Sequence, residues 1–327
     1  MDLNEIFDKI GGLSVAVVGD FCLDVYWEAD MKRSVLSRET PHYPLPVISE
    51  RMSAGGAGNV AVNIAALKPK KVSAVGVTGA DWRADALINC LANAGVNTDG
   101  LIHDVQRVTN CYIKPLRYGH GGVVYEDPRL DFENYSALSS DTEERLIALL
   151  DEGNYDVICV CDQMLYGCIT PSVRKKICNL GAEGRNIIVD SRDRAQLYTD
   201  VIIKPNEVEA LAALGKTLDY ERAAKELSEK TKKPVIITLG ADGCIVYEND
   251  SIKRVSAFRA APPLDICGAG DTFLSAAACV YGTGEALSRA ALIANAASNV
   301  TVRKLHTTGT ASREEITEVL EGNKGRL

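Results

Sequence analysis

Short apolar segments recur along the chain and alternate with segments whose apolar residues follow helical spacing. The first of them, Ser14–Gly19, is typical of a strand that is buried on both faces. Further strands are predicted at residues 72–77, 156–161, 186–190, 200–203, 234–238 and 243–247, with helices at residues 81–94, 141–152, 171–180, 206–214, 219–231, 272–281 and 285–302. This alternation predicts an α/β fold in which helices flank a mainly parallel central sheet on both faces.

Two stretches interrupt this alternation. Residues 25–50 are rich in proline and aromatic residues and end in an apolar strand pattern, and residues 109–127 are typical of a hairpin. Together they predict a small β-sheet lid on a single domain that spans residues 1–327. Because exposed apolar sheets tend to pair, we expect a homodimer through the lid.

The composition is that of an ordinary globular protein, with 46% hydrophobic and 24% charged residues among 327. A net charge of −8 argues against a nucleic-acid or anionic-membrane surface and favours small molecules as partners. No apolar segment approaches the roughly 18 residues that a membrane helix needs, and the first residues are acidic where a signal peptide would be basic. The ten cysteines lack metal-binding spacing, so we expect buried free thiols in the reducing cytoplasm.

The most informative stretch runs from Asp265 to Phe273. Its small residues Gly268, Ala269 and Gly270 let the backbone approach a ligand closely, and the helix predicted to follow adds partial positive charge at its N-terminus. Such a loop stabilises a phosphoryl group that gains charge during transfer. Asp271 is then predicted to be a general base that deprotonates the attacking hydroxyl. The alternative is a glycine-rich turn in which the aspartate only caps the helix.

Polar residues also follow the first predicted strand. Asp20 and Asp24 lie where ligands bind in open α/β sheets and could accept hydrogen bonds from sugar hydroxyls, or they are turn-forming acids. A second glycine loop, with Gly55 and Gly56, leads to Asn59 at the start of a predicted helix. This loop either faces a ligand or is a tight strand-to-helix turn.

Three further candidates lie in the second half of the chain. Asn206 and Glu209 open a helix directly after a strand and could hold a hydrated Mg²⁺ near phosphates, although a helix cap explains the same pair. Thr238 and Gly240 belong to a predicted hairpin turn that could approach a nucleotide. Asn295 lies on a helix rich in small residues, which could lie against an adenine ring or pack closely on another helix.

The order of these motifs resembles one family. A Gly-Gly-x-Gly-Asn loop, an Asn-x-x-Glu pair and a Gly-Ala-Gly-Asp loop are together similar to the ribokinase-like (PfkB) carbohydrate kinases over essentially the whole chain. Within that family, Val-Val-Gly-Asp-Phe-Cys-Leu-Asp-Val-Tyr-Trp, Pro-Leu-Pro-Val and Arg-Leu-Asp-Phe-Glu are most similar to bacterial D-glycero-D-manno-heptose 7-phosphate kinases.

The resemblance implies transfer of the γ-phosphate of ATP to a hydroxyl of a sugar or sugar phosphate, with a heptose 7-phosphate as the first candidate. A kinase for another small sugar or a nucleoside, and a non-catalytic sensor of ATP or sugar, are the alternatives. Carried over to this sequence, the family's roles imply that Asp271 is the catalytic base and that the N–H groups of residues 268–270 form an anion hole.

The resemblance also implies where each ligand binds. The expected sugar contacts are Asp24, Gly55, Gly56 and Asn59, helped by Asp20, Arg129 and Asp162. Mg²⁺ would be organised, mostly through water, by Asn206 and Glu209, and the residues bordering ATP would be Lys204, Asn206, Thr238, Gly240 and Asn295. A monovalent cation such as K⁺ would be held beside the anion hole by the backbone of Asp265 and Cys267. If the substrate carries a phosphate, the nearest cations are Arg129, Lys32 and Arg33, which are otherwise simply solvated.

Overall fold

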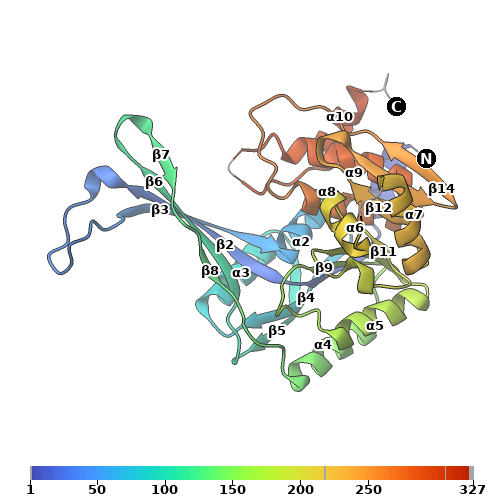
Figure 1. Cartoon of the computed structure of the whole chain (residues 1–327), viewed down its shortest axis with the longest axis horizontal. Coiled ribbons are helices and arrows are strands. Elements are labelled where there is room, and N and C mark those ends of the chain that lie inside the picture. Colours follow the sequence, from blue (N-terminus) through green and yellow to red (C-terminus); the bar gives the residue numbers. More distant parts are fainter. Residues whose placement is uncertain (1, 217–218, 306, 324–327) are drawn as a thin grey trace.

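The computed structural model describes every residue except 1, 217–218, 306 and 324–327, and a large central sheet organises it (Figure 1). The strands of this sheet are β1 (Ser14–Gly19), β4 (Lys71–Gly79), β5 (Asn97–Asp104), β9 (Val157–Asp162), β10 (Asn186–Ser191), β11 (Ile202–Ile203), β12 (Val235–Thr238), β13 (Cys244–Glu248) and β14 (Ser251–Val255). Their spatial order is β14-β13-β12-β11-β10-β9-β1-β4-β5. Neighbours from β5 to β12 are parallel, and β13 and β14 are antiparallel additions, so the predicted mainly parallel sheet is confirmed.

Helices cover both faces of this sheet. One face carries α1 (Leu3–Ile10), α2 (Ala57–Ala66), α3 (Trp82–Asn93), α8 (Ala269–Gly282), α9 (Leu287–Thr301) and α10 (Arg313–Glu321). The other carries α4 (Ser140–Glu152), α5 (Pro171–Ala182), α6 (Glu207–Leu214) and α7 (Tyr220–Thr231). Short 3₁₀ turns are η1 (Met31–Arg33), η2 (His120–Gly122), η3 (Ala195–Leu197) and η4 (Gly240–Asp242).

Alternate residues of β1 enter two separate cores. Val15 and Val17 pack in the core beneath α8 and α9, whereas Ala16 and Val18 pack in the core beneath α4 and α5. Successive side chains of a strand point to opposite faces, so a strand between two helical layers must be apolar at every position. This is why the continuous apolar segment predicted a doubly buried strand.

A second, five-stranded sheet contains most of the residues predicted to form the lid, and we keep the name lid for it. It consists of β2 (Phe21–Asp30), β3 (Val47–Gly56), β6 (Asn110–Tyr118), β7 (Val124–Glu126) and β8 (Leu130–Phe132). Its order is β3-β2-β6-β7, with β8 also pairing with β6, and the β6–β7 pair is the predicted hairpin. Figure 1 shows β3 and the β6–β7 hairpin projecting away from the helices. The sheet extends beyond the expected residues 25–50, because β2 and β3 continue to the glycine loop before α2.

Two strands of the central sheet were not predicted, and both lie at its edges. β5 begins with polar residues, and β14 is mostly polar and almost fully exposed. An edge strand is partly solvated, so it needs no continuous apolar segment. Within the part of the chain described, no helix is both long and apolar enough to cross a membrane.

Candidate active site

The N-terminus of α8 brings the glycine loop and Asp271 together. Gly268 precedes the helix with a left-handed φ of 78°, and a Cβ there would lie 2.7 Å from the Asn59 side-chain nitrogen. Gly270 is exposed, and a Cβ built on it meets no described atom within 4 Å. The first turn of a helix leaves its N–H groups without intrahelical acceptors, although the Ala269 N–H donates to a loop carbonyl at 3.2 Å. The loop therefore presents the positive end of α8 to open space.

Asp271 is held by one amide from the neighbouring helix. The Asn59 side-chain N–H donates to the Asp271 carboxylate at 2.7 Å. Burial raises the pKa of Asp271 to about 6, and the charges of Asp190 and Asp24 act in the same direction, while Asn59 and Lys204 oppose the rise. A carboxylate with a pKa near the working pH is suited to general-base catalysis.

A chain of hydrogen bonds between α2 and α8 fixes that amide. Asn63 donates to the Asn59 Oδ1 at 3.1 Å, and Thr272 donates to the Asn63 Oδ1 at 3.0 Å. Because the Asn59 oxygen is engaged by Asn63, its nitrogen faces Asp271. Sequence reasoning missed Asn63 and Thr272. Asn63 lies four residues after Asn59 and so on the same face of α2, whereas nothing in the spacing of Thr272 indicated its contact with Asn63.

Asp24 lies at the base of the lid beside the second glycine loop. It is buried, and its carboxylate is 3.8 Å from the Lys114 ammonium, which also donates to the Tyr26 hydroxyl at 3.2 Å. Burial raises the pKa of Asp24, although Lys114 opposes the rise. A Cβ on Gly55 would lie 2.6 Å from the same carboxylate, so only glycine fits there. Lys114 was not predicted, since its partner lies on a neighbouring strand 90 positions away.

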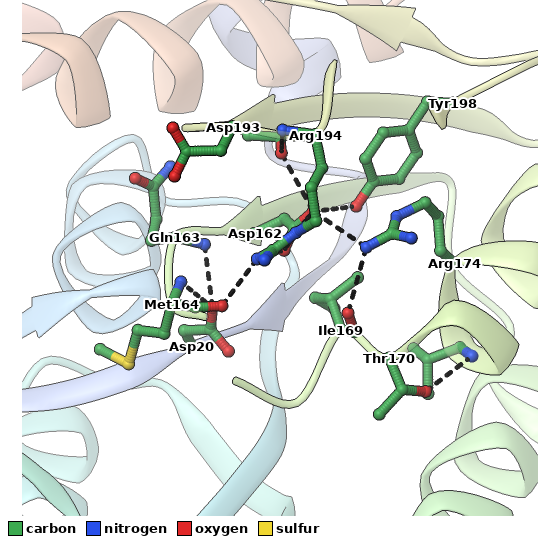
Figure 2. Close-up of polar contacts among 12 residues, drawn as sticks. Asp20, Asp162, Gln163, Met164, Ile169, Thr170, Arg174, Asp193, Arg194 and Tyr198 are labelled. Carbon is green, nitrogen blue, oxygen red and sulfur yellow. Dashed lines mark hydrogen bonds and ion pairs between the residues drawn. The ribbon is translucent and has the colours of Figure 1, made fainter. Parts of the chain in front are cut away.

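Asp20 is engaged by backbone groups rather than left open to a ligand. Its carboxylate accepts N–H groups from Gln163, Met164 and Cys168 at 2.7–2.9 Å, as Figure 2 shows for the first two. It thereby fixes the loop after β9. Gly56 packs on its backbone, because a Cβ on this glycine, whose φ is 55°, would meet the Asp20 carbonyl oxygen at 2.5 Å.

Asp162 lies inside an ion-pair cluster (Figure 2). It is fully buried and pairs with Arg194 and with Arg174, and it accepts hydrogen bonds from Tyr198 at 2.9 Å and Ser191 at 3.0 Å. Sequence reasoning expected both Asp20 and Asp162 to help hold the sugar. In the described structure both carboxylates are held by intramolecular partners, and their contact with a sugar stays a prediction.

Arg129 lies on the lid with a carboxylate partner. It makes two hydrogen bonds to Asp131, at 2.6 and 2.7 Å, and its guanidinium lies 4.3 Å from the Tyr112 ring centroid. Of the other two cations predicted to hold a substrate phosphate, Arg33 pairs with Asp30 at 3.2 Å and Lys32 is exposed. Asp131 of β8 thus largely compensates the charge of Arg129.

Asn206 and Glu209 form the helix cap that was the alternative explanation. The Asn206 side chain accepts the N–H groups of Val208 and Glu209 at 2.9 Å, and Glu209 accepts the Asn206 N–H at 2.9 Å. Burial raises the pKa of Glu209, while Lys204 and Arg192 oppose the rise. Among the described residues, no group of three His, Cys, Asp or Glu side chains could hold a metal ion. A single half-buried carboxylate instead suits a hydrated Mg²⁺ that arrives with nucleotide phosphates.

The expected nucleotide contacts surround the end of β12. The Thr238 N–H donates to the Pro205 carbonyl at 3.0 Å, which joins this strand end to the start of α6. Gly240 has a φ of 54° and faces open space. Asn295 is buried and donates to the carbonyls of Val255 and Ser256 at 3.2 and 3.3 Å, so its amide joins α9 to the segment after β14.

The loop before α8 is ordered by Asp265. Its carboxylate accepts the Cys267 N–H at 3.0 Å, and its own N–H donates to the Val302 carbonyl at 2.8 Å. Cys267 is exposed and directly precedes Gly268. A monovalent cation at this loop stays a prediction.

Two charged residues complete the site. Asp190, near the carboxyl end of β10, pairs with Lys204, and it was not predicted. The sequence could have indicated Asp190, because an acid that ends a buried parallel strand lies at the ligand-binding edge of the sheet. Asp190 and Lys204 both act electrostatically on Asp271.

A mainly parallel sheet with a projecting second sheet is the ribokinase-like architecture, and in this chain a carboxylate lies at the open N-terminus of α8. The chain belongs to the pfkB family of carbohydrate kinases, whose sequence profile matches residues 14–314. The family, the fold class and the enzyme class expected from the sequence are therefore confirmed.

Curated relatives extend this similarity to nearly the whole chain. The bifunctional protein HldE of Citrifermentans bemidjiense is 30% identical over 99% of this chain, and that of Gluconobacter oxydans is 33% identical over 94%. The alignments cover only 66% and 64% of those relatives. This chain thus spans less than two thirds of their length.

Solved structures share the fold. Thermotoga maritima ribokinase has a TM-score of 0.69 at 22% identity, with 94% of this chain and 99% of that chain covered. Escherichia coli phosphofructokinase-2 in complex with fructose-6-phosphate has a TM-score of 0.72 at 20% identity, with 95% and 99% covered. At these identities the likeness establishes the architecture alone.

Proposed function

We propose that this chain transfers the γ-phosphate of ATP to a hydroxyl of a sugar or sugar phosphate, with Asp271 as the general base. The observation that carries the proposal is the position of this carboxylate. It lies in the first turn of α8, next to the exposed Gly270, and burial raises its pKa to about 6. A group that accepts a proton next to a site that stabilises negative charge is the combination that phosphoryl transfer requires.

In the reaction, the acceptor hydroxyl gives its proton to Asp271 as its oxygen attacks the γ-phosphorus. The new O–P bond forms while the bond to the ADP oxygen breaks, and the electron pair of that bond leaves with ADP. The N-terminus of α8, with Gly268, Ala269 and Gly270, stabilises the charge on the phosphoryl oxygens. Asn59 keeps the carboxylate oriented toward the acceptor through its 2.7 Å hydrogen bond.

ATP and Mg²⁺ would bind along the carboxyl edge between β11 and β12. Mg²⁺ would supply charge neutralisation of the phosphates, with Glu209 and Asn206 contacting its water shell. Lys204, Thr238 and Gly240 border the same edge. Asn295 would act from the α9 side, and K⁺ at Asp265 and Cys267 would be accessory.

The acceptor would lie between the lid base and Asp271. Asp24, Gly55, Gly56 and Asn59 would contact the acceptor. Heptose 7-phosphate is the first candidate because the sequences of β1, β2 and β8 are similar to those of heptose kinases. Arg129 is a candidate for contact with a substrate phosphate, in exchange for Asp131.

We also propose a cytoplasmic homodimer that pairs through the lid. The support is a set of exposed apolar lid residues: Val35, Leu36, Tyr43, Leu45, Val47, Ile48, Val123, Val124 and Tyr125. Exposed apolar surface of this kind is typical of an interface.

The test is ADP release from Mg-ATP with a panel of free sugars, sugar phosphates and nucleosides, with the Asp271→Asn protein as blank. Selective turnover with a heptose or hexose phosphate supports the proposal in full. Preference for a free sugar or nucleoside keeps the mechanism and discards the substrate. ATP binding without turnover on any of them would favour a sensor.

A further inference from the structure

The strands β1 and β9 open a crevice at the carboxyl edge of the central sheet. They are parallel neighbours. After β1 the chain continues to the lid and to α2 on one face of the sheet, whereas after β9 it continues to α5 on the other face. Connections that leave adjacent parallel strands toward opposite faces leave a crevice between them, where ligands of open α/β sheets bind. Residues 163–168, which follow β9 and are called the β9 loop below, therefore form one side of that crevice.

Asp20 holds the β9 loop from the β1 side. Its carboxylate accepts the N–H groups of Gln163, Met164 and Cys168 at 2.9, 2.8 and 2.7 Å. A Cβ on Gly167 would overlap the same carboxylate, so the loop lies directly against it. Asp20 thus fixes the loop both at its start and at its end.

The same aspartate connects the β9 loop to the proposed base. The Asp20 carbonyl accepts the N–H of Ala57 at 3.0 Å, and Ala57 is the first residue of α2. Two residues further along this helix, Asn59 donates to Asp271 at 2.7 Å. The loop is therefore joined by hydrogen bonds to the helix that orients the base. Because the acceptor hydroxyl must lie close to that base, the rest of the acceptor can extend along the loop.

Arg194 holds the β9 loop from the opposite side. Its guanidinium pairs with Asp162, the last residue of β9, and donates to the Met164 carbonyl at 2.6 Å (Figure 2). Ser191 fixes both members of this ion pair, because it donates to Asp162 at 3.0 Å and accepts the Arg194 N–H at 3.2 Å. A buried ion pair is by itself weak evidence for stability. A rigid guanidinium shared between a carboxylate and one loop carbonyl does, however, fix the geometry of that loop.

We propose that the β9 loop lines the acceptor site and that Arg194 is the positioning residue for it. Arg194 acts through the Met164 carbonyl, which keeps the backbone of the loop against Asp20, and not by contact with the reacting atoms. The side chains of Gln163 and Met164 are half-buried and therefore accessible to an acceptor in the crevice. This inference rests on the proposed kinase function and deepens it, because it names a side of the site that selects the acceptor.

The first test measures KM for the acceptor and for ATP separately, with heptose 7-phosphate as acceptor or, if the panel favours another sugar, with that sugar. Arg194→Gln should raise the KM for the acceptor about 10-fold, the effect of one lost charge-assisted hydrogen bond. The KM for ATP should not change, because the proposed nucleotide site lies along β11 and β12. Arg194→Lys keeps the charge and should recover part of the loss. An unchanged acceptor KM in Arg194→Gln would overturn the proposal.

Arg174→Gln is the matched control. Arg174 pairs with the same Asp162 carboxylate at 3.7 Å, but it donates to the Ile169 carbonyl at 3.4 Å, outside the β9 loop. Both variants therefore remove one positive charge from Asp162, and only Arg194→Gln releases Met164. Arg174→Gln should lower Tm and leave the acceptor KM unchanged. An equal rise of the acceptor KM in both variants would show that the ion pairs act only through the stability of the fold.

The second test needs no acceptor. It measures amide hydrogen exchange by mass spectrometry in a peptide that contains residues 163–168. Exchange should be about 10-fold faster in Arg194→Gln than in wild type, and unchanged in Arg174→Gln. The same exchange rate in Arg194→Gln and wild type would contradict the role of Arg194. Faster exchange with an unchanged acceptor KM would show that the loop does not line the acceptor site.

The two hypotheses fail separately. If wild type phosphorylates no acceptor, the kinase proposal fails, and hydrogen exchange still decides whether Arg194 holds the loop. If wild type is active and the acceptor KM of Arg194→Gln equals that of wild type, only the Arg194 proposal fails. Should Arg194→Gln not fold, Arg194→Lys serves in both tests with a smaller expected effect.

Discussion

Two carboxylates near the carboxyl edge of the central sheet have opposite surroundings. Asp162, at the end of β9, is fully buried and compensated by Arg194, Arg174 and two hydroxyl groups. Asp271 has a single neutral partner, Asn59, and burial raises its pKa to about 6. The edge of the sheet therefore does not decide which acid is catalytic. The partners decide it, because a fully paired carboxylate cannot accept a proton readily.

The largest expected effect is on catalysis at the poorly compensated acid. Asp271→Asn keeps the shape and removes the proton acceptor, so kcat should fall about 1,000-fold, within the usual range for a general base. ADP release in the presence of the accepted sugar measures it. Asp141→Asn, an exposed acid in the first turn of α4, is the matched control and should leave kcat unchanged. Retained turnover in Asp271→Asn would remove the assignment of the base.

The same variant should be more stable than wild type at pH 8. Because the folded-state pKa of Asp271 is raised above 3.8, folding favours its protonated form. That contribution is fully present below pH 3.8 and is lost as pH rises through about 6. The gain in Tm of the Asn variant should therefore be larger at pH 8 than at pH 5. An equal gain at both pH values would contradict the raised pKa.

The opposite result is expected for the fully compensated acid. Asp162→Ala leaves two arginines without their buried partner, which should cost about 3–5 kcal/mol of unfolding free energy. Urea denaturation measures this loss, and kcat per folded molecule should change little. Asp193→Ala removes a nearby exposed carboxylate and should change stability by less than about 0.5 kcal/mol. A large fall in kcat with unchanged stability would instead indicate that Asp162 contacts the substrate.

The pH profile tests how strongly Asn59 controls the base. In wild type, kcat should fall as pH decreases below about 6, because Asp271 is then protonated. Asn59 opposes the rise of that pKa, so Asn59→Ala should move the acidic limb of the kcat profile to higher pH. The effect on rate should be small at pH 9 and largest near neutrality. An unmoved limb would mean that another group titrates.

The central sheet was predictable because its inner strands are apolar on both faces. The edge strands β5 and β14 were not predicted. Such strands are partly exposed to solvent and therefore do not require a continuous apolar sequence. The glycine loop before α8 was equally predictable, because its glycines and Asp271 are adjacent in the sequence. Asp190 and Lys114 were missed because each acquires its role from a partner on another strand.

The sequence also could not predict which partners the side chains of the expected sugar ligands contact in the fold. Asp20 and Asp24 follow the same strand, four positions apart, and the sequence treats them alike. The structure gives Asp20 three backbone donors, whereas Asp24 lies at the lid base near Lys114. The sequence was also ambiguous for Asn206 and Glu209. Taken alone, this pair was better explained as a helix cap, and the structure contains that cap.

The smallest expected effect comes from the hydrogen bonds that orient Asn59. Thr272→Val keeps the shape of the side chain but removes the hydroxyl that donates to Asn63 at 3.0 Å. Stability should fall by about 1 kcal/mol, and kcat should fall a few-fold because Asn63 then holds Asn59 less firmly. Thr283→Val removes a 2.7 Å hydrogen bond at the other end of α8 and should lower stability similarly without changing kcat. Equal kcat in the two variants would show that the path from Thr272 through Asn63 to Asn59 supports the fold and does not tune the base.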